Sequence, residues 1–320
     1  MDGPVWGITD RPLSASAIES FLHCPYHFFV QRVLGVTTDT AVDEIDVITP
    51  RDLGTLLHSA LENLVTTAQR AGWAPGAGEP WPPDAEAALR GLFDELVADA
   101  KARGLTGWEP SWEATYDRLV ATFGPMLALD TAQVRADPPT APTAAELGFG
   151  GAGEPVVTLE VDGERVLLRG VIDRADLTAD GRSVGIVDYK SGKSGTFSDG
   201  LGKPKPKGVV PERAKVQDLV YDTAARALFP RASDVVVRFL FVPDDGVPTV
   251  ITADHVPDPP AVLRDLLTTM GTAGREGRFA PRPRGAADYC PVCRLLGRRA
   301  VSVAREVSGA DADAEQEVDA

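Results

Sequence analysis

The sequence contains no long apolar run. None of its 320 residues lies in a stretch approaching the roughly 18–20 apolar residues needed to cross a bilayer. The N-terminus also lacks the basic-then-apolar order of a secretion signal. With 43% hydrophobic residues, the chain is long enough for one large domain or two small ones. We therefore expect a soluble, cytoplasmic protein without a membrane partner.

Cysteine is scarce as well. The chain has three, Cys24, Cys290 and Cys293. An odd number argues against a framework of disulfides and leaves metal ligation open. Taken alone, Cys24 is best interpreted as a small buried core residue.

A phosphate-binding loop is also missing. Residues 192–194 (Gly-Lys-Ser) resemble the end of such a loop, but Val187 stands where the motif requires a glycine. The residues before it belong to an apolar run that reads as a strand. The sequence therefore gives no support for an ATP-driven motor.

The chain has fewer basic than acidic residues, and its net charge is −15. Such a balance argues against a nucleic-acid binder, because phosphate contact requires local positive charge. The charge is unevenly placed. Acidic residues without an apolar pattern dominate residues 301–320, which we expect to be a disordered tail. Basic residues form two groups, made of Lys203, Lys205, Lys207, Arg213 and Lys215, and of Arg282, Arg284, Arg294, Arg298 and Arg299. Such local patches are compatible with DNA binding but do not demonstrate it.

The hydrophobic periodicity changes near residue 145 from a helical spacing to a spacing of two. After a loose leader at 1–13, we expect a helix opened by a capping box at Ser16 and interrupted at 23–25, then helices at 55–70, 83–103 and 111–127, and a proline-rich connection at 137–143. Strands are expected at 146–149, 156–161, 165–173, 183–190, 235–242 and 249–251, and helices at 212–228 and 260–275. The pattern predicts the α/β class: a mixed central β-sheet flanked by helices, with a helical insertion at about 72–143.

Two short apolar runs, at residues 170–176 and 185–192, each contain an acid near their end. Turn residues lie between them, so the two runs predict a hairpin. Asp188 and Lys190 are two apart and share a face, and strand pairing would bring Asp173 close to them. Two buried carboxylates are costly together without a cation, so a divalent metal is one interpretation. The alternative is a surface network in which Asp173–Arg174 and Asp188–Lys190 neutralise one another.

Other candidate residues lie on helices. His58, in the helix expected at 55–70, is by itself more often structural than catalytic. Gln217 and Tyr221 are one helical turn apart and share a face. The four tryptophans of the helical insertion are expected to anchor its core: Trp73, Trp81, Trp108 and Trp112.

Five blocks in this order resemble the RecB-like nuclease family of the PD-(D/E)XK superfamily, including the nuclease domain of AddB-type subunits. They are residues 13–29 (with Leu-Ser-Ala-Ser, Cys-Pro-Tyr and Phe-Phe), 54–62 (GTLLHSALE), 170–176 (GVIDRAD), 187–192 (VDYKSG), and Gln217 with Tyr221. Each block alone is weak, but five in the correct order are highly specific. The resemblance implies a restriction-endonuclease-like core spanning 14–300. It also implies a divalent-metal-dependent DNA nuclease, an exonuclease of repair or recombination with a helicase subunit as partner.

The resemblance also implies roles for individual residues. Asp173 and Asp188 would be ligands for Mg²⁺ or Mn²⁺, with His58 and the Tyr189 carbonyl as further ligands. Lys190 would be the catalytic lysine. Gln217 and Tyr221 would position the scissile strand or support the lysine. A second hypothesis is a DNA-binding or scaffolding module of a helicase–nuclease complex with little catalysis of its own.

Related AddB-type domains hold a [4Fe–4S] cluster with four cysteines. Cys24, Cys290 and Cys293 match three of these positions, and Arg299 stands where the fourth would be. Three alternatives stay open: a cluster on three thiolates and another ligand, zinc with a histidine such as His23 or His27, or loss of the metal.

Overall fold

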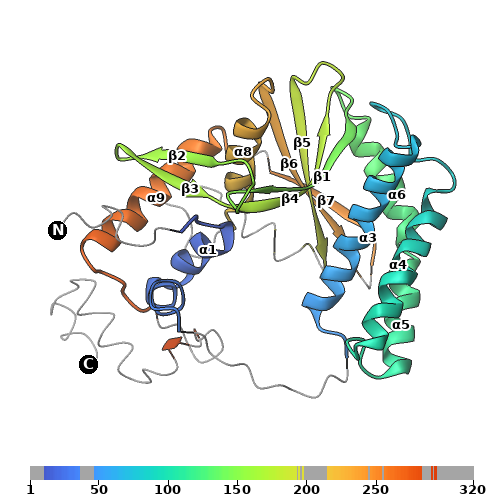
Figure 1. Ribbon diagram of the computed structural model, residues 1–320, viewed down its shortest axis with the longest axis horizontal. Helices are drawn as coiled ribbons and strands as arrows, with labels where there is room; N and C mark the ends of the chain where they lie inside the picture. The colour runs from blue at the N-terminus through green and yellow to red at the C-terminus, as the bar shows by residue number, and fades with distance from the viewer. Residues whose placement is uncertain are drawn as a thin grey trace, which may run out of the picture.

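The computed structural model describes residues 11–36, 47–192, 194, 197, 215–243, 246–253, 256–282, 290 and 292–293. A five-stranded sheet in the order β1-β4-β5-β6-β7 forms its centre (Figure 1). Its strands pair antiparallel except β5 and β6, which are parallel. They are β1 (Ala141–Phe149), β4 (Gly170–Leu177), β5 (Ser183–Ser191), β6 (Asp234–Val242) and β7 (Thr249–Ala253). A separate ribbon consists of β2 (Val157–Val161) and β3 (Glu164–Leu168). The predicted mixed central sheet is confirmed.

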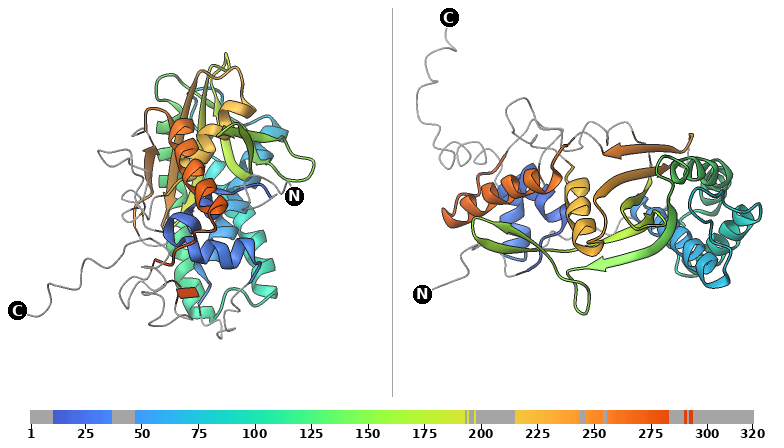
Figure 2. Two further views of the ribbon diagram at one scale, coloured as in Figure 1. Left: turned by 90° about the vertical axis from the view of Figure 1, so that its left-hand side faces the viewer. Right: turned by 90° about the horizontal axis from the view of Figure 1, so that it is seen from above.

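Helices cover both faces of this sheet (Figures 1 and 2). On β5, Val184 and Ile186 belong to one core, whereas Val187 and Tyr189 belong to the other, because successive strand residues point to opposite faces. The first core lies under α1 (Ala15–His23), α8 (Gln217–Leu228), α9 (Pro259–Arg275) and the β2–β3 ribbon. The second lies under α3 (Pro50–Ala71), α4 (Ala85–Ala102), α5 (Glu109–Val120) and α6 (Phe123–Val134). The short α2 (Pro25–Phe28) and the π-helix η1 (Phe29–Val33) follow α1.

Helix α3 is longer than predicted at its start. The Thr49 hydroxyl accepts a hydrogen bond from the Asp52 N–H and so caps the helix, and proline is well tolerated in the first turn that follows. A Cβ on Gly54 would lie 3.0 Å from Ser191 Oγ. The glycine therefore lets α3 approach the end of β5, and His58 follows one helical turn later on the same face.

The helical insertion contains one helix more than predicted. The helix expected at 111–127 is divided into α5 and α6 by a break at Ala121–Thr122, where the Thr122 hydroxyl donates to the Leu119 carbonyl. The expected proline-rich connection also ends early, because β1 begins at Ala141. Trp108 is another correction: its exposed fraction is 66%, whereas Trp112 is buried.

The strand expected at 165–173 is two strands in different sheets. β3 ends at Leu168 and β4 begins at Gly170. Between them the chain hydrogen-bonds to Leu13, which donates to the Leu167 carbonyl and accepts from the Arg169 N–H. Leu13 is buried, so the end of the predicted leader is part of the fold. A tight turn at residues 162–163 joins β2 to β3, with φ of 52° and 81°.

The first helix has a different cap from the one predicted. Ser14, not Ser16, accepts a hydrogen bond from the Ala17 N–H. Glu19, the expected partner in the capping box, instead accepts from the Val216 N–H and pairs with Lys215. A carboxylate that reaches the start of α8 is thus used for a tertiary contact.

Several predictions fall outside the described residues: residues 1–10 of the leader, the start of the helix expected at 212, and the tail at 301–320. The same holds for most of the basic residues singled out above: Lys203, Lys205, Lys207, Arg213, Arg284, Arg294, Arg298 and Arg299. The division at 14–300, 72–143 and 301–320 stays a prediction. Among the helices that the structure describes, none combines the length and hydrophobicity required to cross a bilayer.

Candidate active site

The candidate site forms where β4 and β5 stop pairing. Their ladder ends at Arg174 opposite Val187. Beyond that point, Asp173 Oδ2 accepts a hydrogen bond of 2.8 Å from the Tyr189 N–H. The carboxylate therefore takes the place of a strand partner, which explains how a buried acid is accommodated here. His58, from α3, places its Nδ1 3.2 Å from the same oxygen.

Asp188 and Lys190 meet beside them, with Nζ 2.5 Å from Asp188 Oδ2. Gln217 connects them: its Oε1 accepts from Lys190 Nζ at 2.9 Å, and its Nε2 donates to Asp188 Oδ1 at 2.7 Å. The Tyr221 hydroxyl lies 2.7 Å from Gln217 Nε2, 3.1 Å from Asp188 Oδ1 and 2.8 Å from the Val171 carbonyl. The first two turns of α8 thus supply both side chains that hold the Asp188–Lys190 pair. All predicted residues of this set lie together.

The site carries an excess of negative charge. Burial, followed by the like charge of Asp173, raises the pKa of Asp188 to about 6, against the opposing charges of Lys190 and His58. For His58, burial lowers the pKa, but the hydrogen bond and charge of Asp173 outweigh it, so the net shift is upward. The negative charges of Asp173 and Asp188 raise the pKa values of the groups around them. A bound cation would reduce this repulsion between like charges.

The donor set fits a hard divalent cation. Asp188 Oδ2 is buried and, although Lys190 Nζ lies close, it has no hydrogen bond of good geometry among the described residues. Carboxylate and carbonyl oxygens are the ligands that Mg²⁺ and Mn²⁺ prefer. The ligand atoms of His58, Asp173 and Asp188 do not all lie within 4.8 Å of one another; of the residues that the structure describes, only the cysteines converge that closely.

Glu146 is a site residue that the sequence did not single out. It lies on β1 between Ala145 and Leu147, whose partners on β4 flank Asp173. Its φ of 49° is in the left-handed region that residues other than glycine rarely adopt. Burial, then the charges of Asp173 and Glu62, raise its pKa. Only the β1–β4 pairing identifies it, and that pairing is not legible from local sequence.

Arg174 does not neutralise Asp173. Its guanidinium is buried on the other face, where Nη2 lies 2.6 Å from Asp130 Oδ1 and Nε lies 2.7 Å from Asp176 Oδ1. It also donates to the Tyr189 hydroxyl at 2.9 Å. The predicted alternative of a surface network with an Asp173–Arg174 pair is therefore wrong. The Asp188–Lys190 contact exists, but the Asp188 side chain is only 2% exposed.

The three cysteines form a second centre. Cys24, Cys290 and Cys293 are buried, their sulfur atoms all lie within 4.8 Å of one another, and Cys24 Sγ is 3.6 Å from Cys293 Sγ. They join segments 269 residues apart. Burial raises the pKa values of the Cys290 and Cys293 thiols. The sequence-predicted grouping of the three cysteines is thus present, and it places a metal-binding residue type at both ends of the described chain.

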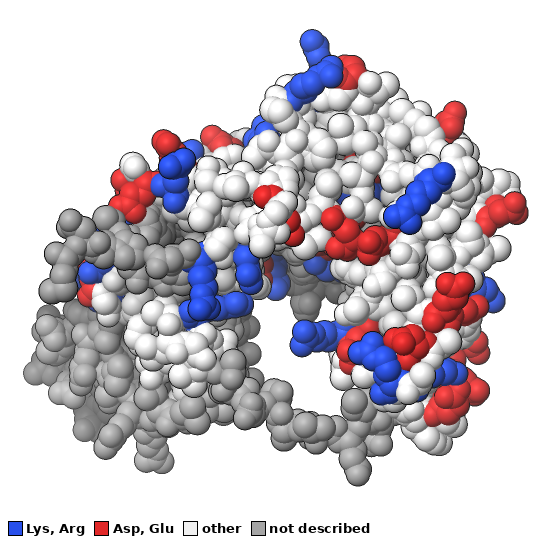
Figure 3. Space-filling model, in the orientation of Figure 1, with Lys and Arg blue, Asp and Glu red and all other residues white. Residues whose placement is uncertain are grey.

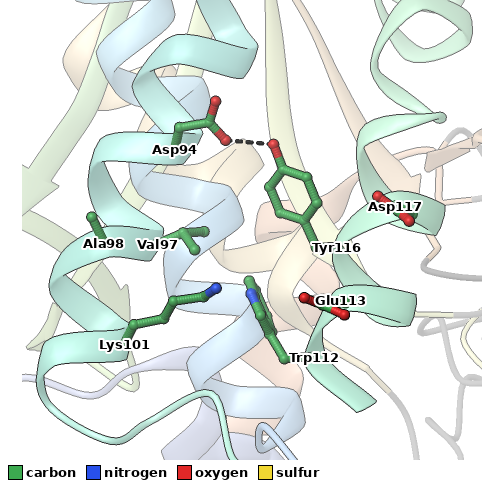
Figure 4. A pocket seen from close by; sticks show the side chains of 8 residues that line it. All are labelled: Asp94, Val97, Ala98, Lys101, Trp112, Glu113, Tyr116 and Asp117. Carbon is green, nitrogen blue, oxygen red and sulfur yellow. Dashed lines mark hydrogen bonds between the residues drawn. The ribbon is translucent and has the colours of Figure 1, made fainter. Parts of the chain in front are cut away.

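A groove of about 510 Å³ between α4 and α5 lies apart from both centres (Figure 4). The Tyr116 hydroxyl donates to Asp94 Oδ1 across it. Its charged lining is mainly acidic, which disfavours phosphate binding. The lining residues are Asp94, Val97, Ala98, Lys101, Trp112, Glu113, Tyr116 and Asp117. On the face shown in Figure 3, by contrast, Lys and Arg side chains border the hollow beneath the central sheet.

Asp218 follows Gln217 on α8 but lies outside this set. Burial raises its pKa to about 7, well above the value near 4 of an unfolded chain. The folded state therefore favours the protonated form, and the free energy of unfolding should fall as pH rises from about 4 to 7.

Asp218→Asn should remove this decline and stabilise the protein by up to about 4 kcal/mol at pH 8, with little effect at pH 4. Urea unfolding at both pH values measures it. The exposed Asp117→Asn is the control, and an equal gain at both pH values would contradict the assignment.

The profile described as "PD-(D/E)XK nuclease superfamily" matches residues 12–295. The B-type subunit of an ATP-dependent helicase/deoxyribonuclease from Acetivibrio thermocellus is 30% identical over 185 residues, 56% of this chain and 15% of that protein. The same-named protein from Clostridium tetani is 29% identical over 188 residues, 57% of this chain and 15% of that protein. The chain thus spans about 15% of the length of these relatives. A crystal structure of a protein from Eubacterium rectale covers 89% of this chain and 88% of its own, at 14% identity and a TM-score of 0.45.

Proposed function

The chain belongs to the PD-(D/E)XK nuclease superfamily, and from this premise we propose that it is a divalent-metal-dependent DNA nuclease, an exonuclease acting in DNA repair or recombination. The observation that carries the proposal is the meeting of Asp173, Asp188 and Lys190 at the point where β4 and β5 separate. We also propose that it acts in the cytoplasm.

Asp173, Asp188, His58 and the Tyr189 carbonyl are the residues that would hold Mg²⁺ or Mn²⁺. When bound, the cation supplies positive charge against the charge that develops on the phosphate. His58 presents Nδ1 to the Asp173 carboxylate, an arrangement that leaves Nε2 for ligation and fixes the ring orientation. Asp173 Oδ2 accepts from Tyr189 and faces His58, so Oδ1 is the oxygen to offer to a cation.

Lys190 provides a positive charge at the site. Its side chain is 24% exposed, so its ammonium can donate hydrogen bonds to the scissile phosphate or orient the attacking water. Gln217 holds the ammonium through Oε1, and the Tyr221 hydroxyl positions Gln217 in turn. Together these three residues would orient the attacking water and stabilise the negative charge that develops on the phosphate. Electrostatic stabilisation of this kind is the largest contribution to many enzymatic rates.

Digestion of end-labelled single- and double-stranded DNA with Mg²⁺ or Mn²⁺ tests the proposal. We expect release of nucleotides from ends, complete loss of cleavage with a chelator, and recovery when the cation is restored. Asp188→Ala should abolish cleavage. Cleavage that persists in the presence of excess chelator, or in Asp188→Ala, would contradict it.

The second candidate function is a DNA-binding or scaffolding module in a helicase–nuclease assembly. It is favoured by the relatives, which are subunits with "helicase/deoxyribonuclease" in their names and of which this chain spans about 15%. We propose a helicase subunit as partner in either case. Salt-dependent DNA binding without cleavage under any divalent cation would support this second function over the first.

A further inference from the structure

The cysteine centre does not fit the cluster that the family resemblance implies. A cubane cluster holds four thiolates at the outer corners of a cage of irons and sulfides, but this chain has three cysteines. The three sulfur atoms lie within 4.8 Å of one another, a separation too small to surround such a cage. A single zinc ion with tetrahedral Zn–S bonds of about 2.3 Å instead requires sulfurs about 3.8 Å apart. The 3.6 Å between Cys24 Sγ and Cys293 Sγ is close to that value.

A fourth ligand is suggested by a repeated spacing. Residues 24–27 read Cys-Pro-Tyr-His and residues 290–293 read Cys-Pro-Val-Cys. Two residues between ligands is a spacing typical of structural zinc sites. The second position of the first pair is His27, which lies on α2, the helix that Cys24 begins as its N-cap.

His27 has a nitrogen available for ligation. Its Nε2 is buried and has no hydrogen-bond partner among the residues that the structure describes. A side-chain hydrogen bond with Gln31 engages the ring, as the outer partners of zinc-bound histidines do. His27 lies outside the 4.8 Å group of the sulfurs, so ligation requires a rotation of its side chain.

We propose that Cys24, Cys290, Cys293 and His27 bind a single zinc ion in place of an iron–sulfur cluster. The three thiols release their protons to solvent on binding. The apolar group at this point consists of the three cysteines and Val292, with Tyr26 and Val30 against it. So small a group stabilises little by burial, whereas zinc binding contributes folding free energy directly. The ion connects α2 to Cys290 and Cys293.

Metal analysis of the full chain purified without oxygen is the first test. We expect one zinc ion per chain, neither iron nor sulfide, and colourless protein. Stoichiometric iron and sulfide with visible absorption would overturn the proposal, and so would protein that contains no metal and takes up no added zinc. DNA cleavage is not the measurement, so the outcome is independent of the proposed function.

Variants and cobalt substitution test the ligands. Cys24→Ser should lose zinc and unfold at a lower temperature. Because this variant could fail to fold, Co²⁺ titrated into the metal-depleted native chain provides a second measurement: it should give thiolate-to-cobalt charge transfer and the intense visible bands of a tetrahedral site.

His27→Ala should weaken zinc binding at least about 10-fold and shift the cobalt bands. His23→Ala, at the neighbouring histidine, is the matched control. An unchanged cobalt spectrum in His27→Ala would overturn His27 as the fourth ligand.

Discussion

Lys190→Met should reduce the rate of DNA cleavage at least about 100-fold. Methionine keeps an unbranched stem of similar length beside the rings of Phe197 and Phe239, which lie 5.9 and 5.7 Å from Nζ, but it removes the positive charge and every donor. The loss should appear in the rate constant at saturating DNA more than in the affinity, because only one charge near the reacting phosphate changes. Single-turnover cleavage of end-labelled DNA in Mg²⁺ measures it.

The matched control is Lys101→Met. Lys101, on α4, also lies 2.5 Å from a carboxylate, that of Glu109, but it is remote from the site. An exposed ion pair of this kind is worth little, so cleavage and stability should both be unchanged. Equal cleavage by Lys190→Met and the native chain would refute the role of Lys190. Equal loss in both variants would show that the effect is not specific to the site.

A stability measurement separates a catalytic loss from a folding loss. Removing the ammonium deprives Asp188 of the nearest positive charge, so its buried carboxylate becomes less favourable. The double variant Asp188→Asn with Lys190→Met removes both charges and should recover the melting temperature, yet remain inactive. A double variant that regained cleavage would contradict the metal-ligand role of Asp188.

Much of this site could be predicted because it depends on two short periodicities. Asp188 and Lys190 share a face by strand alternation, and Gln217 and Tyr221 by the helical turn. What could not be predicted is how strands pair at a distance in the sequence. Glu146 reaches the site only because β1 pairs with β4, and nothing in its neighbours specifies that pairing.

The predicted ends of strands and helices were wrong where a tertiary contact outweighed the local sequence pattern. The pattern at 165–173 predicts one strand, but hydrogen bonds to Leu13 separate β3 from β4. Ser14 and Ser16 are both competent helix caps, and the choice depends on Glu19, which binds at the start of α8 instead of completing a capping box. Each boundary depends on a contact with a residue far away in the sequence, Leu13 for the strands and Val216 for the helix cap, which a local pattern does not contain.

The partner of Arg174 could not be predicted from local sequence either, and this contact matters more for the stability of the fold. Its neighbour in sequence, Asp173, suggested an ion pair, yet Arg174 points to the opposite face and its partner Asp130 belongs to α6, 44 residues earlier. Both side chains are 2% exposed. Because Asp130 also accepts from Trp81 Nε1 at 2.7 Å, this single carboxylate connects the helical insertion to the central sheet.

Asp130→Ala should therefore destabilise the chain by about 3–5 kcal/mol. The substitution leaves a buried guanidinium with one carboxylate, Asp176, where it had two, and an arginine does not escape the cost by losing its proton. Urea unfolding followed by tryptophan fluorescence measures the change, and Trp81 should report it directly because its indole N–H loses a partner. The control is Asp99→Ala, which removes an exposed pair with Arg103 at 3.2 Å and should change stability by less than about 0.5 kcal/mol.

The double variant Asp130→Ala with Arg174→Met decides between two explanations of such a loss. If the cost arises from the uncompensated charge, removing the guanidinium as well should recover much of the stability. If it arises from lost packing of α6, the two losses should add. The first outcome is expected because the Arg174 and Asp130 side chains are both buried, each only 2% exposed. Arg174 also donates to the Tyr189 hydroxyl, and Tyr189 is the residue whose N–H holds Asp173. The single variant Asp130→Ala should accordingly lower DNA cleavage as well as stability, through the position of Asp173 and without any contact between Asp130 and DNA.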